Sequence, residues 1–143
     1  MEVTEEVPVQ QEKLTIAIPK ESLTDMALEN LQKITANKQT LFQRAFRMDS
    51  TEIEITEEKI NFTLFPYTAD GDEIAVYTQF ISRLCDMARD AKRVSSKPTE
   101  TDNDKYAFRC LLLRLGFIGK EHKTARKILL RNLTGNSAFR SVK

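Results

Sequence analysis

Two short segments in the middle of the chain alternate strictly between polar and apolar residues, as strands with one buried face do. They are EIEIT at residues 52–56 and INFTL at residues 60–64. The three polar residues 57–59 between them form a connection short enough for a hairpin. The pattern therefore predicts an antiparallel hairpin that places Ile53, Ile55, Ile60, Phe62 and Leu64 on one face, with Phe65 and Pro66 ending the pairing.

A third segment near the start of the chain has the same alternation. Leu14, Ile16 and Ile18 are separated by Thr15 and Ala17, and Pro19 follows. An isolated hairpin is only marginally stable in water, so a third strand is needed to form a sheet that can be packed on one side. We expect a small antiparallel sheet of about three strands.

The rest of the chain shows helical periodicity, in which apolar residues recur every three or four positions. Ser22, three residues before Asp25, predicts the start of a helix that ends near Asn37. A short helix over residues 40–47 follows, and Asp70 in the sequence DGD is expected to cap a long helix over residues 72–93 rather than to form a calcium loop. Two further helices are expected over residues 104–115 and 120–132, with Gly116 ending the first of them. The fold class is therefore α+β.

The predicted buried residues of these helices follow from the same periodicity. Met26 and Ala27 are expected on the buried face of the first helix, together with Leu23, Leu31 and Ile34. The helix over 104–115 is expected to bury Tyr106, Ala107, Cys110, Leu111, Leu113 and Leu115, and the last helix Ala125, Ile128, Leu129 and Leu133.

Composition changes along the chain predict four regions. Residues 1–12 are an acidic tail, which we expect to be flexible, and residues 13–94 form the α+β core. Residues 95–104 are polar and contain Pro98, so we expect a linker there. Residues 105–143 form a basic helical subdomain.

Positive charge is concentrated in that last region. One acid, Glu121, stands there against ten basic residues, so that residues 105–143 carry a net charge of +9 although the whole chain carries only +1. Such an asymmetry indicates a polyanionic partner. The ten basic residues are Lys105, Arg109, Arg114, Lys120, Lys123, Arg126, Lys127, Arg131, Arg140 and Lys143.

The last predicted helix arranges part of this charge in a stripe. Lys123, Lys127 and Arg131 are spaced by four residues and share one side of the helix. Lys120 and Arg126 flank the stripe, and Arg109 and Arg114 on the preceding helix are expected to widen it. These seven residues are the predicted nucleic-acid-binding site.

The stripe also has explanations that involve no nucleic acid. It can be a solvated face, or it can dock on the acidic body of the same chain. The two helices around Gly116 and Gly119 fit either an ordinary helical hairpin or a helix-turn-helix unit. The acidic clusters over residues 52–58 and 2–12 fit a soluble surface, a docking site for a basic protein, or a nucleic-acid mimic.

Catalytic signals are weak, and the sequence favours a binding protein over an enzyme. His122 is the one candidate for acid or base chemistry. The chain has no phosphate-binding loop, nucleophile elbow or dinucleotide fingerprint, and no metal or cofactor is predicted.

Cys85 and Cys110 are expected to be free thiols. Neither a membrane-spanning run nor a signal pattern is present, so we expect a cytoplasmic protein.

The C-terminal sequence KYAFRCLLLRLGFIGKEHKTARKILLRNLTGNSAFR, over residues 105–140, resembles small "virulence-related" proteins encoded on conjugative elements and phages of Gram-positive bacteria. EKINFTLFP at residues 58–66 adds to the resemblance. Such elements also encode type II anti-CRISPR proteins, which bind Cas9 or its guide RNA. The resemblance implies an accessory protein in a bacterial host cell that binds nucleic acid (guide RNA or DNA) or a Cas9-type ribonucleoprotein, most specifically a Cas9 inhibitor. A small nuclease acting on RNA and a DNA-binding accessory of element transfer are the alternatives.

Overall fold

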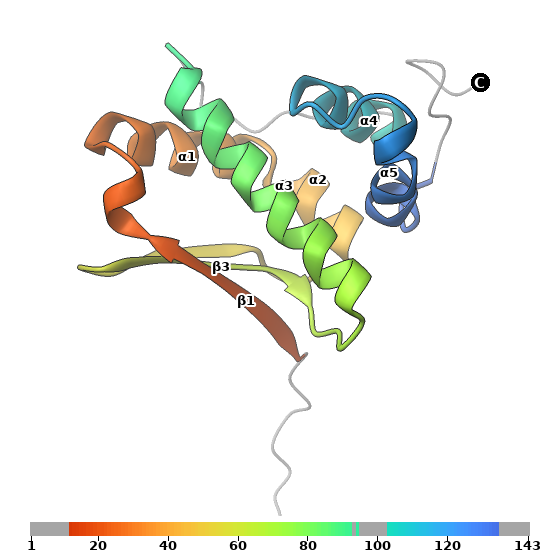
Figure 1. Ribbon diagram of the computed structural model, residues 1–143, viewed down its shortest axis with the longest axis horizontal. Helices are drawn as coiled ribbons and strands as arrows, with labels where there is room; N and C mark the ends of the chain where they lie inside the picture. The colour runs from red at the N-terminus through yellow and green to blue at the C-terminus, as the bar shows by residue number, and fades with distance from the viewer. Residues whose placement is uncertain (1–11, 93, 95–102, 135–143) are drawn as a thin grey trace, which may run out of the picture.

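A computed structural model describes residues 12–92, 94 and 103–134 of the chain. Their fold is α+β, as predicted: helices cover one face of a three-stranded antiparallel sheet (Figure 1). The strands are β1 (Lys13–Pro19), β2 (Glu52–Ile55) and β3 (Lys59–Pro66). The α-helices are α1 (Asp25–Asn37), α2 (Gln39–Phe46), α3 (Gly71–Asp90), α4 (Asp104–Arg114) and α5 (Lys123–Leu130), and the short 3-10 helices are η1 (Lys20–Ser22) and η2 (Lys120–His122).

The predicted hairpin and third strand are confirmed. Strand β3 lies in the centre of the sheet, with β1 on one side and β2 on the other. Ile53 lies opposite Phe62 and Ile55 opposite Ile60, so the alternating apolar residues share the face that the helices cover. The Thr56 hydroxyl accepts a hydrogen bond from the Lys59 amide at 3.0 Å and closes the turn.

Phe65 and Pro66 lie beyond the hairpin pairing, which ends at Thr63 as the prediction implies, but they do not end the pairing of β3 with β1. Leu14 pairs with Phe65 and Lys13 with Pro66, so β3 continues through both residues. The register shifts between Leu14 and Ile16, and this irregularity lets Leu64 and Phe65 both be buried although they are adjacent in sequence. The central strand thereby supplies an additional ring to the core.

The start of α1 also differs from the prediction. Thr24, not Ser22, caps this helix by accepting a hydrogen bond from the Ala27 amide, while the Ser22 hydroxyl donates to the Pro19 carbonyl within the turn of η1. Met26 is 67% exposed rather than buried, because it lies just outside the arc of α1 that holds the buried Ala27, Leu31 and Ile34. Asp70 caps α3 as predicted, with its carboxylate accepting from the amides of Asp72 and Glu73.

One hydrophobic cluster includes residues from every major element, α4 and α5 among them. Phe108 of α4 lies edge-on to Phe42 and Phe46 of α2, with ring centroids 6.2 and 5.8 Å apart, and Phe46 lies 4.7 Å from Phe65 of β3. Such pairs add to the free energy gained from burying the rings themselves. The basic C-terminal helices therefore pack on the same core as the sheet.

The buried face of α4 differs from the predicted one. Phe108, Leu111, Leu112 and Leu115 are buried, whereas Tyr106, Ala107, Cys110 and Leu113 are only half-buried. In α5 and the turn after it, Ala125, Leu129 and Leu133 are buried as predicted, together with Leu130, whereas Ile128 is half-buried.

Polar contacts join the two parts of the chain on either side of the segment 95–102, which lies outside the described residues. Asn103 caps α4, and Asp104 accepts two hydrogen bonds from one terminal nitrogen of Arg44 in α2, at 2.9 and 3.1 Å. The Asn132 side chain donates to the Ala45 carbonyl at 3.0 Å. None of the described helices combines the length and the apolar character that crossing a membrane requires.

Candidate nucleic-acid interface

The connection between α4 and α5 is built on two glycines with positive φ angles. Gly116, at φ 99°, follows the last turn of α4, where its amide donates to Leu113 and the Phe117 amide to Leu112. This pair of hydrogen bonds is the Schellman motif, and it confirms Gly116 as the residue that ends the helix. A Cβ atom at Gly116 would lie 2.7 Å from a terminal nitrogen of Arg83 in α3, the end of a flexible side chain that can move aside, so it is the positive φ angle that calls for glycine here.

Arg126 holds this connection in place. Its Nη1 atom donates to the carbonyl oxygens of Phe117 and Gly119, each at 3.0 Å. The ring of Phe117 is fully buried below, while Ile118 is 59% exposed. Arg126 is therefore used within the protein, although the sequence placed it beside the predicted stripe.

Arg131, the third residue of the predicted stripe, turns toward α3. Its guanidinium donates to the Glu73 carboxylate at 2.8 Å and lies 3.5 Å from the Tyr77 hydroxyl. Hydrogen bonds from the Thr68 hydroxyl and from Arg131 lower the pKa of Glu73. Burial raises the pKa of Tyr77, an effect that the charge of Arg131 opposes. Arg131 therefore follows the alternative in which the basic segment docks on the acidic body of the same chain.

Arg109 and Arg114 do not extend one common surface. They are five residues apart in α4, which separates their side chains by about 140° around the helix axis. Arg114 is exposed beside Lys38 at the α1–α2 junction, where both residues line a cavity, whereas Arg109 lies half-buried on a different side of α4. The structure therefore does not bring the seven predicted residues together.

Of the seven predicted residues, the three lysines are exposed and form no ion pair with any described residue, and we call them the lysine patch: Lys120, Lys123 and Lys127. Lys123 and Lys127 are four residues apart on α5 and share one side of the helix, and Lys120 precedes them by about one turn. Thr124, which is also exposed, lies beside them. The patch joins the two lysines of the predicted stripe to Lys120, which was predicted to flank the stripe.

His122 is half-buried next to the patch. Its ring lies edge-on to Phe117, with centroids 5.6 Å apart. Within the part of the chain that the structure describes, no hydrogen bond or ion pair reaches its imidazole. Nothing there orients it as an acid or base, so its visible role is to pack against the ring of Phe117.

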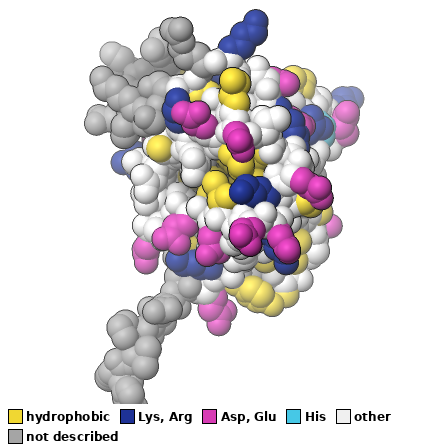
Figure 2. Space-filling view, turned by 90° about the vertical axis from the view of Figure 1, so that its left-hand side faces the viewer, with side chains coloured by type: hydrophobic (Ala, Val, Ile, Leu, Met, Phe, Trp, Pro, Cys, Tyr) yellow, Lys and Arg dark blue, Asp and Glu magenta, His cyan; other side chains and the backbone are white. Residues whose placement is uncertain are grey.

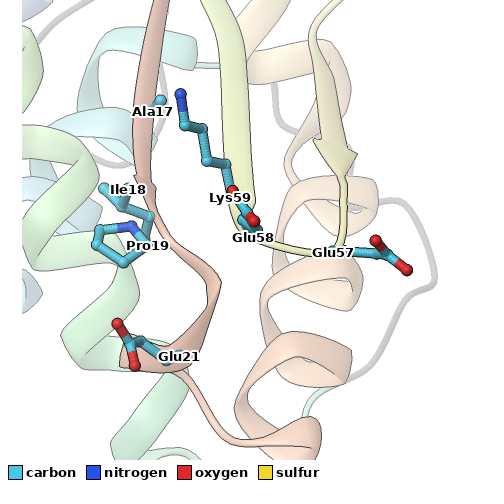
Figure 3. A pocket seen from close by; sticks show the side chains of 7 residues that line it. All are labelled: Ala17, Ile18, Pro19, Glu21, Glu57, Glu58 and Lys59. Atoms are coloured by element: carbon cyan, nitrogen blue, oxygen red, sulfur yellow. The ribbon is translucent and has the colours of Figure 1, made fainter.

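On the side of the molecule that carries α1 and the β2–β3 turn, acidic and basic side chains are mixed (Figure 2). Acidic side chains lie around a small apolar area on this side (Figure 2). A shallow pocket there is lined by Pro19, Glu21, Glu57, Glu58 and Lys59, with Ala17 and Ile18. Glu57 points away from the pocket, and Lys59 runs toward Ala17 (Figure 3). The carboxylates do not converge, and no group of metal-ligating side chains occurs among the described residues.

Sequence reasoning did not identify the partners of the arginines. Glu73 lies in the first turn of α3, and nothing in its spacing indicates that Arg131 reaches it. Lys38 was not singled out, because a lone lysine between two helices carries no pattern. The capping acid Asp70 was identified, because its distance from the helix start is a local signal.

Comparison of the chain with models of known protein families, with curated proteins and with solved structures found no match.

Proposed function

We propose that the protein is a non-enzymatic binding protein whose lysine patch contacts the phosphate backbone of a nucleic acid. The observation that carries this proposal is the exposure of Lys120, Lys123 and Lys127 without a paired carboxylate among the described residues. Like charges four residues apart destabilise a helix by a few tenths of a kcal/mol. A bound polyanion would remove this cost and release its condensed counterions.

The residue types around the patch favour contacts with the phosphate backbone over recognition of the bases. The exposed apolar residue beside it is Ile118, which has no ring on which a base can stack. The uncovered face of the sheet is a poorer candidate, because it carries Glu52 and Glu54 together with Thr15, Asn61 and Thr63, and no aromatic residue. Lys13 and Lys59 also belong to this face, but Glu52 and Glu54 balance their charge, so we assign the interface to η2 and α5.

Binding through three lysines has a defined salt dependence. Each phosphate neutralised on duplex DNA contributes about −0.9 to the slope of log K against log salt, so the three lysines predict a slope of about −2.7. Affinity is then expected to fall about 40-fold between 50 and 200 mM salt. A single strand is expected to give a shallower slope, of about −2.1.

The test compares two double variants with equal loss of charge. Lys123→Gln with Lys127→Gln removes two lysines of the patch, and Lys13→Gln with Lys59→Gln removes two exposed lysines from the sheet. Fluorescence anisotropy with labelled RNA and DNA across a salt series should show a slope reduced to about −0.9 in the first variant and unchanged in the second. Equal weakening in both variants would mean that net charge, not the patch, determines binding.

The resemblance of the C-terminal segment to proteins of mobile elements supports a more specific form of the proposal. In this form the nucleic acid is the guide RNA of a Cas9-type ribonucleoprotein, and binding inhibits it. Co-purification with Cas9, with and without guide RNA, tests it directly. Absence of co-elution, with RNA binding by the patch intact, would reject the Cas9 partner and leave the binding proposal standing.

A further inference from the structure

A cavity of about 210 Å³ lies where α1, α3 and α4 meet, away from the lysine patch. Its apolar wall comes from Ile34 of α1, Met87 of α3 with Ala91 just after it, and Leu111 of α4. Lys38 and Arg114 line the same cavity. Two cations and the amide of Asn37 therefore share this space with an apolar wall.

Lys38 carries its charge in an unfavourable environment. Burial lowers the pKa of Lys38, and the positive charge of Arg114 lowers it further. No carboxylate is present among the described residues that line the cavity, and none of them forms an ion pair with Lys38 or Arg114. A partly buried charge without a counter-charge is costly, and an anion placed between the two cations would offset that cost.

From this arrangement we propose that the cavity binds a small ligand with one anionic head group, a carboxylate or a phosphate, on a short apolar body. The head group would contact Lys38 and Arg114, and the body would pack against Ile34, Met87 and Leu111. The positive charges favour an anionic head group, and the apolar wall favours an apolar body attached to that head group. This site is independent of the proposed nucleic-acid interface.

The size of the cavity limits the ligand. A dry cavity of about 150 Å³ accommodates benzene, whereas sites for drug-sized ligands begin at about 300 Å³. With about 210 Å³, the cavity fits an apolar body of about six carbon atoms.

Four probes separate the contributions of head group and body. Hexanoate and hexyl phosphate carry both parts, acetate carries only the anion, and hexanol carries only the apolar body. Titration followed by amide NMR shifts should saturate for at least one of the first two and centre on Ala91 and Leu111, with acetate and hexanol at least tenfold weaker. The stronger of the two identifies the head group. Equal binding of hexanol, or unsaturated shifts spread over the whole chain, would overturn the proposal.

Matched variants locate the binding. Arg114→Gln should weaken the better probe at least tenfold, whereas Arg109→Gln, the same change elsewhere on α4, should alter binding less than twofold. Ala91→Leu fills the cavity and should abolish binding, and Lys38→Met should do the same while the melting temperature is kept or raised. If Arg109→Gln and Arg114→Gln weaken binding equally, or if Ala91→Leu binds normally, the cavity is not the site.

Discussion

Helix α5 and its C-terminal cap carry four cations that behave in two different ways. Arg126 and Arg131 donate hydrogen bonds to acceptors in the α4–α5 connection and in α3, whereas Lys123 and Lys127 extend into solvent. All four contribute equally to the charge of the sequence. The difference teaches that a basic segment can stabilise its own fold with one set of cations and leave another set available to a partner.

The chemistry of the two side chains explains the division. A guanidinium presents several donors in a planar arrangement, so one Arg126 nitrogen reaches two carbonyl oxygens while Arg131 contacts both Glu73 and Tyr77. An ammonium on a flexible stem is strongly hydrated and gains little from a fixed position. Arginines are therefore the internal links here, and lysines form the solvent-facing patch.

The largest effect on stability is expected in the hydrophobic core, because α4 and α5, which carry both sets of cations, pack on it. Phe108→Ala removes the ring that joins α4 to α2 and α3, and it should lower the free energy of unfolding by about 3–5 kcal/mol. Urea unfolding followed by circular dichroism measures the loss. Burial raises the pKa of the Cys85 thiol to about 11, so its labelling rate reports opening of α3 separately. Unchanged Cys85 labelling in a destabilised variant would show that α4 and α5 unfold alone.

Removal of an internal arginine is expected to have the second largest effect. Arg126→Gln leaves the carbonyls of Phe117 and Gly119 without their charged donor and should cost about 1–2 kcal/mol of stability. Arg126→Lys is the control for charge. If the lysine variant restores full stability in thermal melts, the directed hydrogen bonds are not what distinguishes Arg126 from its lysine neighbours.

The ion pair between Arg131 and Glu73 should contribute less, because both side chains are partly exposed. Arg131→Leu is expected to cost at most about 1 kcal/mol at pH 7. Since the pKa of Glu73 is lowered in the folded state, its contribution is present above the unfolded value of about 4.3 and is lost as the pH falls through the lowered value. Unfolding free energies at several pH values between 7 and 2 should therefore decrease less in Arg131→Leu than in the parent. If the unfolding free energy decreases equally in both proteins, Arg131 does not affect the titration of Glu73.

The smallest effect on stability is expected in the lysine patch. Lys123→Ala and Lys127→Ala should each change the unfolding free energy by less than about 0.5 kcal/mol, because neither side chain has a partner among the described residues. At low salt the change should be slightly stabilising, since one repulsive pair is removed. A loss of unfolding free energy above about 1 kcal/mol in either variant would mean that this lysine stabilises the fold, as the two arginines do.

Local patterns predicted most of the fold. Strict alternation identified the hairpin, and Asp70 and Gly116 marked helix ends because capping depends on residues close in sequence. The buried face of α4 was not predictable in the same way. Residues 106–113 are apolar on nearly every side, so the periodicity does not determine which side faces the core, and only the rings of α2 and α3 select Phe108.

The candidate site was predicted only in part, for a related physical reason. Spacing by four residues placed Lys123 and Lys127 on one side of α5, because that relation is local. The contacts of Arg131 with Glu73 and of Arg114 with the cavity depend on tertiary packing between helices far apart in sequence. Charge patterns along the chain carry no information about such pairings.

The position of β3 between its two partners has a consequence for how the chain assembles during synthesis. β3 reaches β2 across the short turn at residues 56–58, but it reaches β1 only across residues 20–58. Closing the longer loop costs more entropy, so β1 should join after the hairpin has formed. On the ribosome, β1 emerges first and waits until Pro66 has been made before its pairing can be completed. During that interval Leu14, Ile16 and Ile18 have no strand partner, so these apolar side chains stay accessible to a chaperone.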